Sequence, residues 1–324
     1  MSFFGDVMLI EVEQVTPIAV SNAELAQWSR EGSAFFTLAL RLSKLIPRGK
    51  CFFPRWMGRL LGKNDKFAIR TARGALLAVD PDNWDVFTRM ILKGGTWDRL
   101  VIEACIGCLH PGDVFYDLGA NVGYMSIEAA SLFQDTIKIC AFEPQPNLAQ
   151  VAAISARLNN FRNVSIYDIM LGKEGGTANL FIPAHCVHAS SISRESNARS
   201  ITCRVEALDE LVSNGNIPPP DLVKIDVEGG ELNVFQGMKN IIQEVTPYII
   251  FEADDNMNRF GYNREDLINY ILSLADYQFF HIIEKGFFPI NRAEINQIYT
   301  ADILAVPKGR PIPNKPDLKA HRHM

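Results

Sequence analysis

A strand pattern, a glycine-rich turn and a helix pattern follow one another over residues 114–130. Val114, Tyr116 and Leu118 alternate along an extended chain, whereas the apolar residues from Met125 onward recur at helical spacing. A turn that joins a strand to a helix presents backbone N–H groups at the helix N-terminus, and its glycines let a ligand approach the main chain. The pattern therefore predicts a ligand site at this turn.

Similar alternating stretches recur along the rest of the chain, with helical spacing between most of them. The segments that we predict as further strands are residues 137–142, 163–168, 222–226, 248–251, 277–283 and 301–306. Strands that alternate with helices are typical of an α/β fold in which a mostly parallel sheet is covered on both faces. We therefore predict a doubly wound α/β protein.

Two pairs of strand-like segments are typical of β-hairpins. The first pair spans residues 67–80 and turns near Gly74. The second is an insertion within residues 172–204, in which a strand over residues 177–182 and a returning strand over residues 200–205 enclose a long polar loop. A long loop in a compact domain commonly covers a binding site.

The N-terminal part of the chain is predicted as an extension of residues 1–93, with a helical cap that includes a helix from Asn22. Residues 94–306 then form the main domain, and residues 307–324 form a tail. Within the extension, residues 34–62 combine apolar residues with Lys and Arg and contain no acidic residue. Such a segment could lie on an anionic membrane or bind an acidic partner. The commoner arrangement is a pair of helices packed on the main domain with the basic side in water.

Acidic residues around the turn distinguish between the ligands that it could bind. Asp117 lies two residues before Gly119, and Glu143 follows the second strand. A carboxylate in the position of Asp117 would repel a pyrophosphate, but it could accept hydrogen bonds from an ammonium group or a ribose hydroxyl. Because the third glycine of a dinucleotide site is also missing, the turn fits S-adenosylmethionine better than NAD. Glu143 would hold the ribose diol of either cofactor.

Three ordered motifs carry a resemblance to a known family. They are Asp117-Leu-Gly-Ala-Asn-Val-Gly-Tyr124, Ala141-Phe-Glu-Pro144 and Lys224-Ile-Asp-Val-Glu-Gly-Gly-Glu231. Over residues 94–306 the chain resembles the FkbM-type S-adenosylmethionine-dependent methyltransferases. The resemblance implies a class I, Rossmann-like methyltransferase fold with a mostly parallel seven-stranded sheet, whose seventh strand is antiparallel. It also implies methyl transfer, mostly to a hydroxyl oxygen of a small metabolite or sugar, as in secondary metabolite biosynthesis. Sugar, polyketide, peptide and lipid-headgroup acceptors all stay compatible.

We expect the cofactor to contact the turn and the ends of the neighbouring strands. The expected contacts are Asp117, Gly119, Asn121, Gly123, Tyr124, Glu143, Pro144, Asp168, Ile169 and Asp226. Asp168 could accept a hydrogen bond from the adenine amino group while Ile169 covers the ring, or it could only end the strand as a turn residue. The resemblance also places Asp98 near the cofactor or substrate, with a helix cap as the alternative.

Carboxylates at the ends of two further strands are the candidates for the chemistry. Asp226, Glu228 and Glu252 should meet, because the carboxyl ends of parallel strands line one crevice. They could orient and deprotonate a hydroxyl group, or hold a Mg²⁺ ion that lowers its pKa. Alternatively, Asp226 positions the cofactor amine while Glu228 binds the substrate. His188 in the long polar loop is a further candidate for a general base, although a loop histidine is more often a plain surface group.

Composition and charge indicate which partners and which cellular location we expect for the protein. The formal net charge of −5 gives no reason to expect a nucleic acid partner. The chain has no apolar run of about 20 residues, and its N-terminus does not resemble a secretory signal, so we expect a cytoplasmic protein with reduced cysteines. The residues that could form a zinc site with the pair Cys105 and Cys108 are His185, Cys186, His188 and Cys203. No second pair at zinc-finger spacing supports that site, and small core residues are the simpler interpretation.

The leading hypothesis is an S-adenosylmethionine-dependent O-methyltransferase that acts on the hydroxyl group of a small molecule. The alternative from another class is a non-catalytic protein of the same fold that serves as a scaffold at a membrane or with a partner, through residues 34–62. This alternative is disfavoured because Asp117, Glu143, Asp226 and Glu228 all occur together. An NAD-dependent oxidoreductase is a weaker third hypothesis. The oligomeric state is not predicted.

Overall fold

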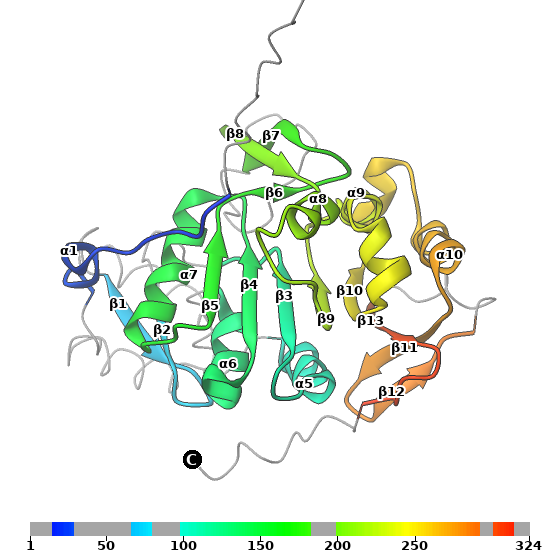
Figure 1. Cartoon of the computed structure of the whole chain (residues 1–324), viewed down its shortest axis with the longest axis horizontal. Coiled ribbons are helices and arrows are strands. Elements are labelled where there is room, and N and C mark those ends of the chain that lie inside the picture. The colour runs from blue at the N-terminus through cyan, green and yellow to red at the C-terminus, as the bar shows by residue number, and fades with distance from the viewer. Residues whose placement is uncertain (1–14, 29–65, 80–97, 183–198, 292–300, 314–324) are drawn as a thin grey trace, which may run out of the picture.

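The computed structural model describes residues 15–28, 66–79, 98–182, 199–291 and 301–313. Figure 1 shows a central sheet with helices on both faces. Among the predicted features, the basic segment 34–62 and the polar loop that contains His188 lie outside the described residues.

The part of the chain that the structure describes forms a central sheet of eight strands. In spatial order they are β12 (Gly286–Pro289), β11 (Tyr277–Ile283), β13 (Ala301–Pro307), β10 (Tyr248–Ala253), β9 (Leu222–Ile225), β3 (Val114–Leu118), β4 (Lys138–Phe142) and β5 (Val164–Tyr167). The five strands from β10 to β5 are parallel, whereas β13, β11 and β12 are antiparallel to their neighbours. All seven predicted strands are present. The predicted number of seven is nevertheless too small, because the chain folds back after Ile283 and adds β12 at the edge.

Within the described residues, six helices form two layers, one on each face of this sheet. They are α5 (Arg99–Cys108), α6 (Tyr124–Phe133) and α7 (Pro146–Leu158) on one face, and α8 (Leu208–Ser213), α9 (Glu231–Gly237) and α10 (Arg264–Leu274) on the other. Short 3-10 and π-helical segments η1 (Gln134–Thr136), η2 (Ile241–Val245) and η3 (Asp255–Phe260) connect some of these elements. The arrangement confirms the predicted α/β fold in which helices cover both faces of the sheet.

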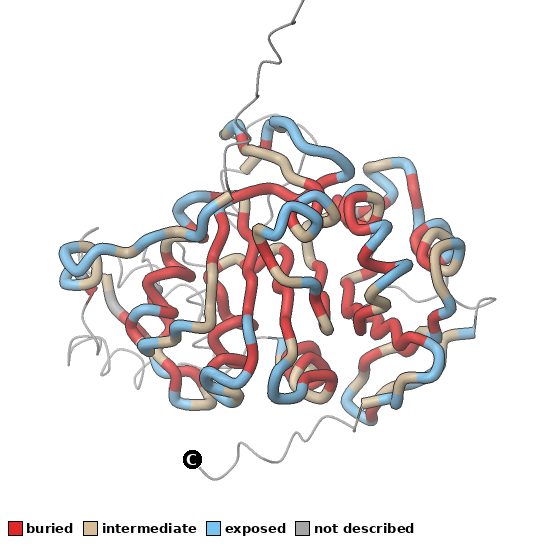
Figure 2. The backbone as a smooth tube through the Cα atoms, in the orientation of Figure 1, coloured by how far each residue is buried: buried red, intermediate tan, exposed pale blue. Residues whose placement is uncertain are grey.

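Side chains of the central strands alternate between the two helix layers. Phe115 packs in the cluster that includes α5, α6 and α7, whereas Tyr116 and Leu118 pack in the cluster of α8, α9 and α10. Every residue of β3 is buried, and Figure 2 shows burial running through the middle of the sheet. Strands that are buried on both faces are typical of parallel sheets.

A second sheet of three strands confirms the predicted hairpin insertion. Its strands, in spatial order, are β6 (Met170–Leu171), β8 (Arg199–Glu206) and β7 (Gly176–Ile182), with β7 and β8 antiparallel. The hairpin lies beyond the carboxyl ends of β4 and β5 (Figure 1). The Cys203 thiol donates to the carbonyl oxygen of Pro144 at 3.3 Å, and this bond ties the hairpin to the segment after β4.

The first predicted hairpin is also present. It consists of β1 (Phe67–Arg70) and β2 (Leu76–Val79), which pair antiparallel around a turn that contains Gly74. Arg73 in this turn forms ion pairs with Glu103 of α5 at 2.8 Å and with Glu128 of α6 at 3.0 Å. The hairpin therefore packs on the main domain. The helix predicted from Asn22 is short, α1 (Asn22–Leu25).

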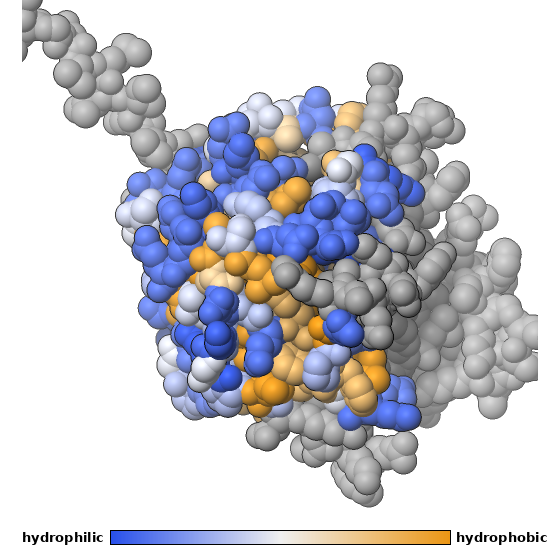
Figure 3. Space-filling view, turned by 90° about the vertical axis from the view of Figure 1, so that its right-hand side faces the viewer, coloured by the Kyte–Doolittle hydropathy of each residue, from blue (hydrophilic) through white to orange (hydrophobic). Residues whose placement is uncertain are grey.

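The side of the molecule that carries β11, β12 and α10 has a mixed surface. Figure 3 shows hydrophobic side chains gathered in the middle of this side, with hydrophilic ones around them. No helix in the described part of the chain is long and apolar enough to cross a membrane.

Candidate active site

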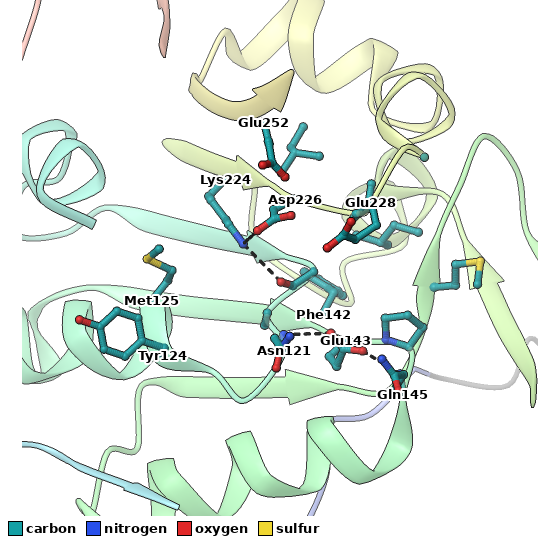
Figure 4. A pocket seen from close by; sticks show the side chains of 18 of the residues that line it. Asn121, Tyr124, Met125, Phe142, Glu143, Gln145, Lys224, Asp226, Glu228 and Glu252 are labelled. Atoms are coloured by element: carbon teal, nitrogen blue, oxygen red, sulfur yellow. Dashed lines mark hydrogen bonds and ion pairs between the residues drawn. The ribbon is translucent and has the colours of Figure 1, made fainter. Parts of the chain in front are cut away.

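A cavity of about 410 Å³ lies at the carboxyl ends of the parallel strands. Its wall consists of the turn after β3, the segment after β4, the end of β9 with the turn that follows, and residues of α5, α6, β6, β7, β10 and β13. These elements are far apart in the sequence but meet at one edge of the sheet. In Figure 4, Glu143 lies on one side of the cavity, and Lys224, Asp226, Glu228 and Glu252 lie on the other.

The turn after β3 is packed so closely that only glycine fits at its first position. The N–H groups of Gly119 and Ala120 both donate to the carbonyl oxygen of Phe142, each at 2.9 Å. Gly119 has a φ of 75°, and a Cβ placed on it would lie 1.8 Å from the carbonyl oxygen of Asp226. Gly119 therefore contributes only backbone to the cavity wall, as a ligand that contacts the main chain requires.

The second glycine of the turn lies where two helices approach each other closely. Gly123, with a φ of 79°, precedes α6, and a Cβ placed on it would lie 2.8 Å from the Cβ of Ala152 in α7. Gly123 is not among the residues that line the cavity. The close approach of α6 and α7 therefore explains why this position is a glycine. Tyr124, the next residue, is buried and does line the cavity.

The carboxylate of Glu143 is buried in the wall and held by two backbone groups. The N–H of Asn121 donates to one carboxylate oxygen and the N–H of Gln145 donates to the other, both at 2.9 Å (Figure 4). Asn121 has a φ of 55°, so the turn itself directs this N–H toward the carboxylate. Burial raises the pKa of Glu143 to about 7, against the opposing effect of these backbone groups. Each oxygen keeps a lone pair that can accept a hydroxyl group of a ligand.

Lys224 joins the two acids that flank the turn. Its Nζ lies 3.4 Å from Oδ1 of Asp117 and 3.4 Å from Oδ2 of Asp226, and it donates to the carbonyl oxygen of Gly119 at 3.3 Å. Burial alone would lower the pKa of Lys224, but Asp226 and Asp117 raise it above its usual value. Lys224 is therefore a buried cation that fixes β3, β9 and the turn together.

Asp117 is placed differently from the expected cofactor contact. Its side chain is fully buried, it accepts from the hydroxyl of Ser126 at 2.7 Å, and it does not line the cavity. Lys224, which forms an ion pair with Asp117, lines the cavity instead. The sequence did not suggest Lys224 as a site residue. The sequence feature that could have indicated it is a lysine within an otherwise apolar strand. Its position beside Asp117 depends on the register of β3 with β9, which the sequence does not reveal.

The far end of the cavity is rich in carboxylates. The structure brings together Asp226, Glu228 and Glu252, the three acids predicted to meet, and adds Asp254 and Asp302 to the same wall. Glu228 has a φ of 56°, so the turn after β9 bends sharply where it passes the cavity. No sequence pattern pointed to Asp302, because it lies on an antiparallel strand near the end of the chain.

Two of these acids, Glu252 and Asp302, have a raised pKa. Burial, followed by the charges of Asp226, Asp254 and Asp302, raises the pKa of Glu252 well above its usual value. Burial, together with Asp98 and Asp226, raises the pKa of Asp302 to about 7. Asp98 itself lines the cavity, and it precedes α5 without forming a side-chain cap hydrogen bond. The geometry thus supports the expected position near a ligand rather than the cap.

An apolar stretch of the wall continues from Pro144 to the second sheet. Ile169, Met170 and Leu180 line the cavity here, with Ile169 in its expected place. Asp168 is exposed and is not among the lining residues, so the structure does not place it against a ligand in this cavity. The apolar stretch is suited to the flat face of an adenine ring.

Metal ligands are not gathered in the part of the chain that the structure describes. Within residues 15–28, 66–79, 98–182, 199–291 and 301–313, no group of three or more His, Cys, Asp or Glu side chains is arranged to hold a metal ion. The hypotheses of a Mg²⁺ and a zinc site therefore gain no support from these residues. Cys105, Cys108, Cys140 and Cys203 are buried free thiols, in agreement with small core residues.

The chain is similar to several known methyltransferases. The model of the methyltransferase FkbM domain family matches residues 117–284. A hexuronic acid methyltransferase, AglP of Haloferax volcanii, is 30% identical over 153 residues, which cover 47% of this chain and 59% of that protein. The crystal structure of a methyltransferase FkbM from Methylobacillus flagellatus is similar with a TM-score of 0.44 and 16% identity, over 69% of this chain and 54% of that one. The chain thus spans less than two thirds of the length of both relatives.

Proposed function

Because the chain belongs to the FkbM methyltransferase family, we propose that it transfers the methyl group of S-adenosylmethionine to a hydroxyl group of a sugar or another small metabolite. The observation that carries the proposal is the buried carboxylate of Glu143, which two backbone N–H groups orient in the cavity wall. A carboxylate held in this way is suited to a ribose diol, since a hydroxyl pair can donate to its two oxygens.

The rest of the wall fits the other parts of the cofactor. Gly119 leaves bare backbone in the cavity wall, and the apolar residues Ile169 and Met170, which also line the cavity, would cover an adenine ring. Asp226 at the end of β9 offers a carboxylate for the ammonium group of the amino-acid end, and Lys224 holds that carboxylate in place. These residues would hold the cofactor through its ribose, its base and its amino acid.

The carboxylates at the far end would act on the acceptor. When bound, S-adenosylmethionine supplies a methyl group on a sulfonium, which is open to in-line attack by a nucleophile. Asp226, Glu228 and Glu252 would accept hydrogen bonds from the acceptor, orient the attacking oxygen and receive its proton. A hydroxyl group is the acceptor that suits this wall, because a carboxylate acceptor would be repelled by the same acids.

A sugar is the preferred acceptor in this proposal. The relative from Haloferax volcanii is named for a hexuronic acid, which carries both hydroxyl groups and a carboxyl group. We would incubate the enzyme with methyl-labelled S-adenosylmethionine and either a hexuronic acid or the matching neutral hexose. A labelled product that withstands mild alkali is an ether and supports hydroxyl methylation. Label released by mild alkali would indicate a methyl ester and contradict it.

Binding of the cofactor is tested by calorimetric titration with S-adenosylmethionine, S-adenosylhomocysteine and NAD, each with and without Mg²⁺. The proposal expects saturable binding of the first two ligands and none of NAD. Absence of binding by both adenosyl ligands would contradict it and favour the scaffold hypothesis. A change in affinity on adding Mg²⁺ would revive the hypothesis of a metal near the site.

Replacing Glu143 with alanine should weaken the binding of S-adenosylhomocysteine by roughly 100-fold, because two hydrogen bonds to a charged group are lost. The matched control is Glu174→Ala, which removes an exposed carboxylate that does not line the cavity. The measurement is the same titration, after thermal unfolding has shown that both variants are folded. Affinity in Glu143→Ala equal to that of the control would remove Glu143 from the cofactor site.

A further inference from the structure

Glu252 and Asp302 are directly opposite each other in the sheet. The antiparallel register of β10 and β13 pairs them, so their side chains leave the sheet on the same face. Both side chains line the cavity. Directly opposite residues have Cβ atoms about 5 Å apart, so the two side chains are neighbours in the cavity wall.

The groups around this pair are mostly negative. From the end of β9 and the following turn come Asp226 and Glu228, and from the start of α5 comes Asp98. Asp254 follows β10 on the same wall. The lysine that lines the cavity among the described residues, Lys224, is already engaged by two aspartates.

The histidine on the neighbouring strand faces the other way. His281 of β11 pairs with Ile303, the residue after Asp302, so its side chain lies on the opposite face of the sheet. Two carboxyl groups in acidic surroundings resist ionising together, since the second charge would add to the first. Burial and the charges of Asp226, Asp254 and Asp302 raise the pKa of Glu252, and burial with the charges of Asp98 and Asp226 raises the pKa of Asp302.

We propose that Glu252 and Asp302 share one proton in the free enzyme, release it when the sulfonium of S-adenosylmethionine binds, and take up the proton of the acceptor hydroxyl during methyl transfer. The inference rests on the proposed function and adds Asp302 to its chemistry. As the bond from the acceptor oxygen to the methyl carbon forms, the bond from carbon to sulfur breaks and the electron pair stays on sulfur. The oxygen gives its proton to the carboxyl pair. The sulfonium loses one positive charge while the pair gains one, so the total charge in the cavity is unchanged.

The two adenosyl ligands separate this inference from the proposed function. S-adenosylmethionine carries the sulfonium, whereas S-adenosylhomocysteine has a neutral sulfur and the same amino-acid end. A positive sulfonium favours the ionised carboxylate, so its binding lowers the pKa of the pair and expels a proton. The affinity for S-adenosylmethionine should therefore rise with pH relative to that for S-adenosylhomocysteine, by up to about tenfold per pH unit for each proton released.

The experiment is calorimetric titration of the full chain with each ligand in two buffers of different ionisation enthalpy, with a chelator present, from neutral to mildly alkaline pH. We expect release of roughly half a proton or more for each S-adenosylmethionine bound, and none for S-adenosylhomocysteine. Asp302→Asn and Glu252→Gln should each bind both ligands but lose most of this release. Asp276→Asn, an exposed carboxylate paired with Lys308, should keep it.

The outcomes are distinct. Equal proton exchange for the two ligands, or full release in both Asp302→Asn and Glu252→Gln, would overturn the shared proton while leaving the proposed function intact. Failure of the wild-type chain to bind either ligand would overturn the proposed function and this inference with it. Asp302→Asn and Glu252→Gln test the pair independently. If one of the two variants does not fold, the other still provides the test.

Discussion

The Gly119→Ala variant should lose at least about 100-fold in affinity for S-adenosylhomocysteine. An added Cβ would lie 1.8 Å from the carbonyl oxygen of Asp226, a distance at which the backbone itself must move. The turn would then have to leave the two hydrogen bonds that Gly119 and Ala120 make to Phe142. The same shift would move the N–H of Asn121 away from Glu143, so one methyl group would disturb both the bare backbone and the carboxylate proposed to hold the ribose.

A second glycine provides the control for this result. Gly215 has a φ of 70°, nearly that of Gly119, but a Cβ placed on it would meet no atom within 4 Å. Gly215→Ala therefore places an alanine in a left-handed backbone conformation, which is unfavourable, but brings its Cβ into contact with no other atom. Calorimetric titration of both variants measures the difference. Similar affinities in the two would mean that the turn is not the part of the cavity that holds the cofactor.

Replacing Lys224 with methionine should lower the free energy of unfolding by about 3–5 kcal/mol. The variant keeps the volume of the side chain but removes the cation that lies 3.4 Å from both Asp117 and Asp226. Asp117 is fully buried, so its charge would then lack the opposing charge of the lysine. Urea unfolding monitored by circular dichroism measures the effect.

Lys308→Met serves as the comparison. Lys308 also forms an ion pair, with Asp276 at 3.2 Å, but the side chains are 72% and 76% exposed. Such surface pairs contribute about 1 kcal/mol or less. The double variant Lys224→Met with Asp117→Asn should recover part of the lost free energy of unfolding, because it also removes the negative charge of Asp117, one of the two carboxylates that Lys224 contacts. A loss in Lys224→Met as small as that in Lys308→Met would show that the buried lysine does not hold the turn.

Much of the fold and part of the site could be predicted from the chain alone. Alternating strands and helical spacing locate every strand of the sheet except its edge. The position of an acid at the end of a parallel strand identifies Glu143, Asp226 and Glu252, because such ends gather at one edge of the sheet. These predictions depend on local sequence and a general rule of topology, and neither needs the exact pairing of residues.

The features that escaped prediction depend on register and packing. Asp302 enters the cavity because β13 runs antiparallel in one particular register beside β10. Gly123 resembles a ligand-binding glycine in sequence, yet in the structure it allows α6 to approach Ala152 of α7. Asp168 follows the pattern of an adenine contact but faces solvent at the end of β5. A short motif cannot distinguish these cases, since each is decided by residues far away in the sequence.

The ion pairs of Arg73 have a consequence for how the chain can be divided. This arginine lies in the turn of the N-terminal hairpin and contacts Glu103 and Glu128, which belong to the two helices next to the cavity. Removal of the hairpin would take the guanidinium away from two buried carboxylates at once. A chimera that exchanges N-terminal regions between relatives would therefore need to exchange these three charges together, so the hairpin and the two helices would be inherited as one unit.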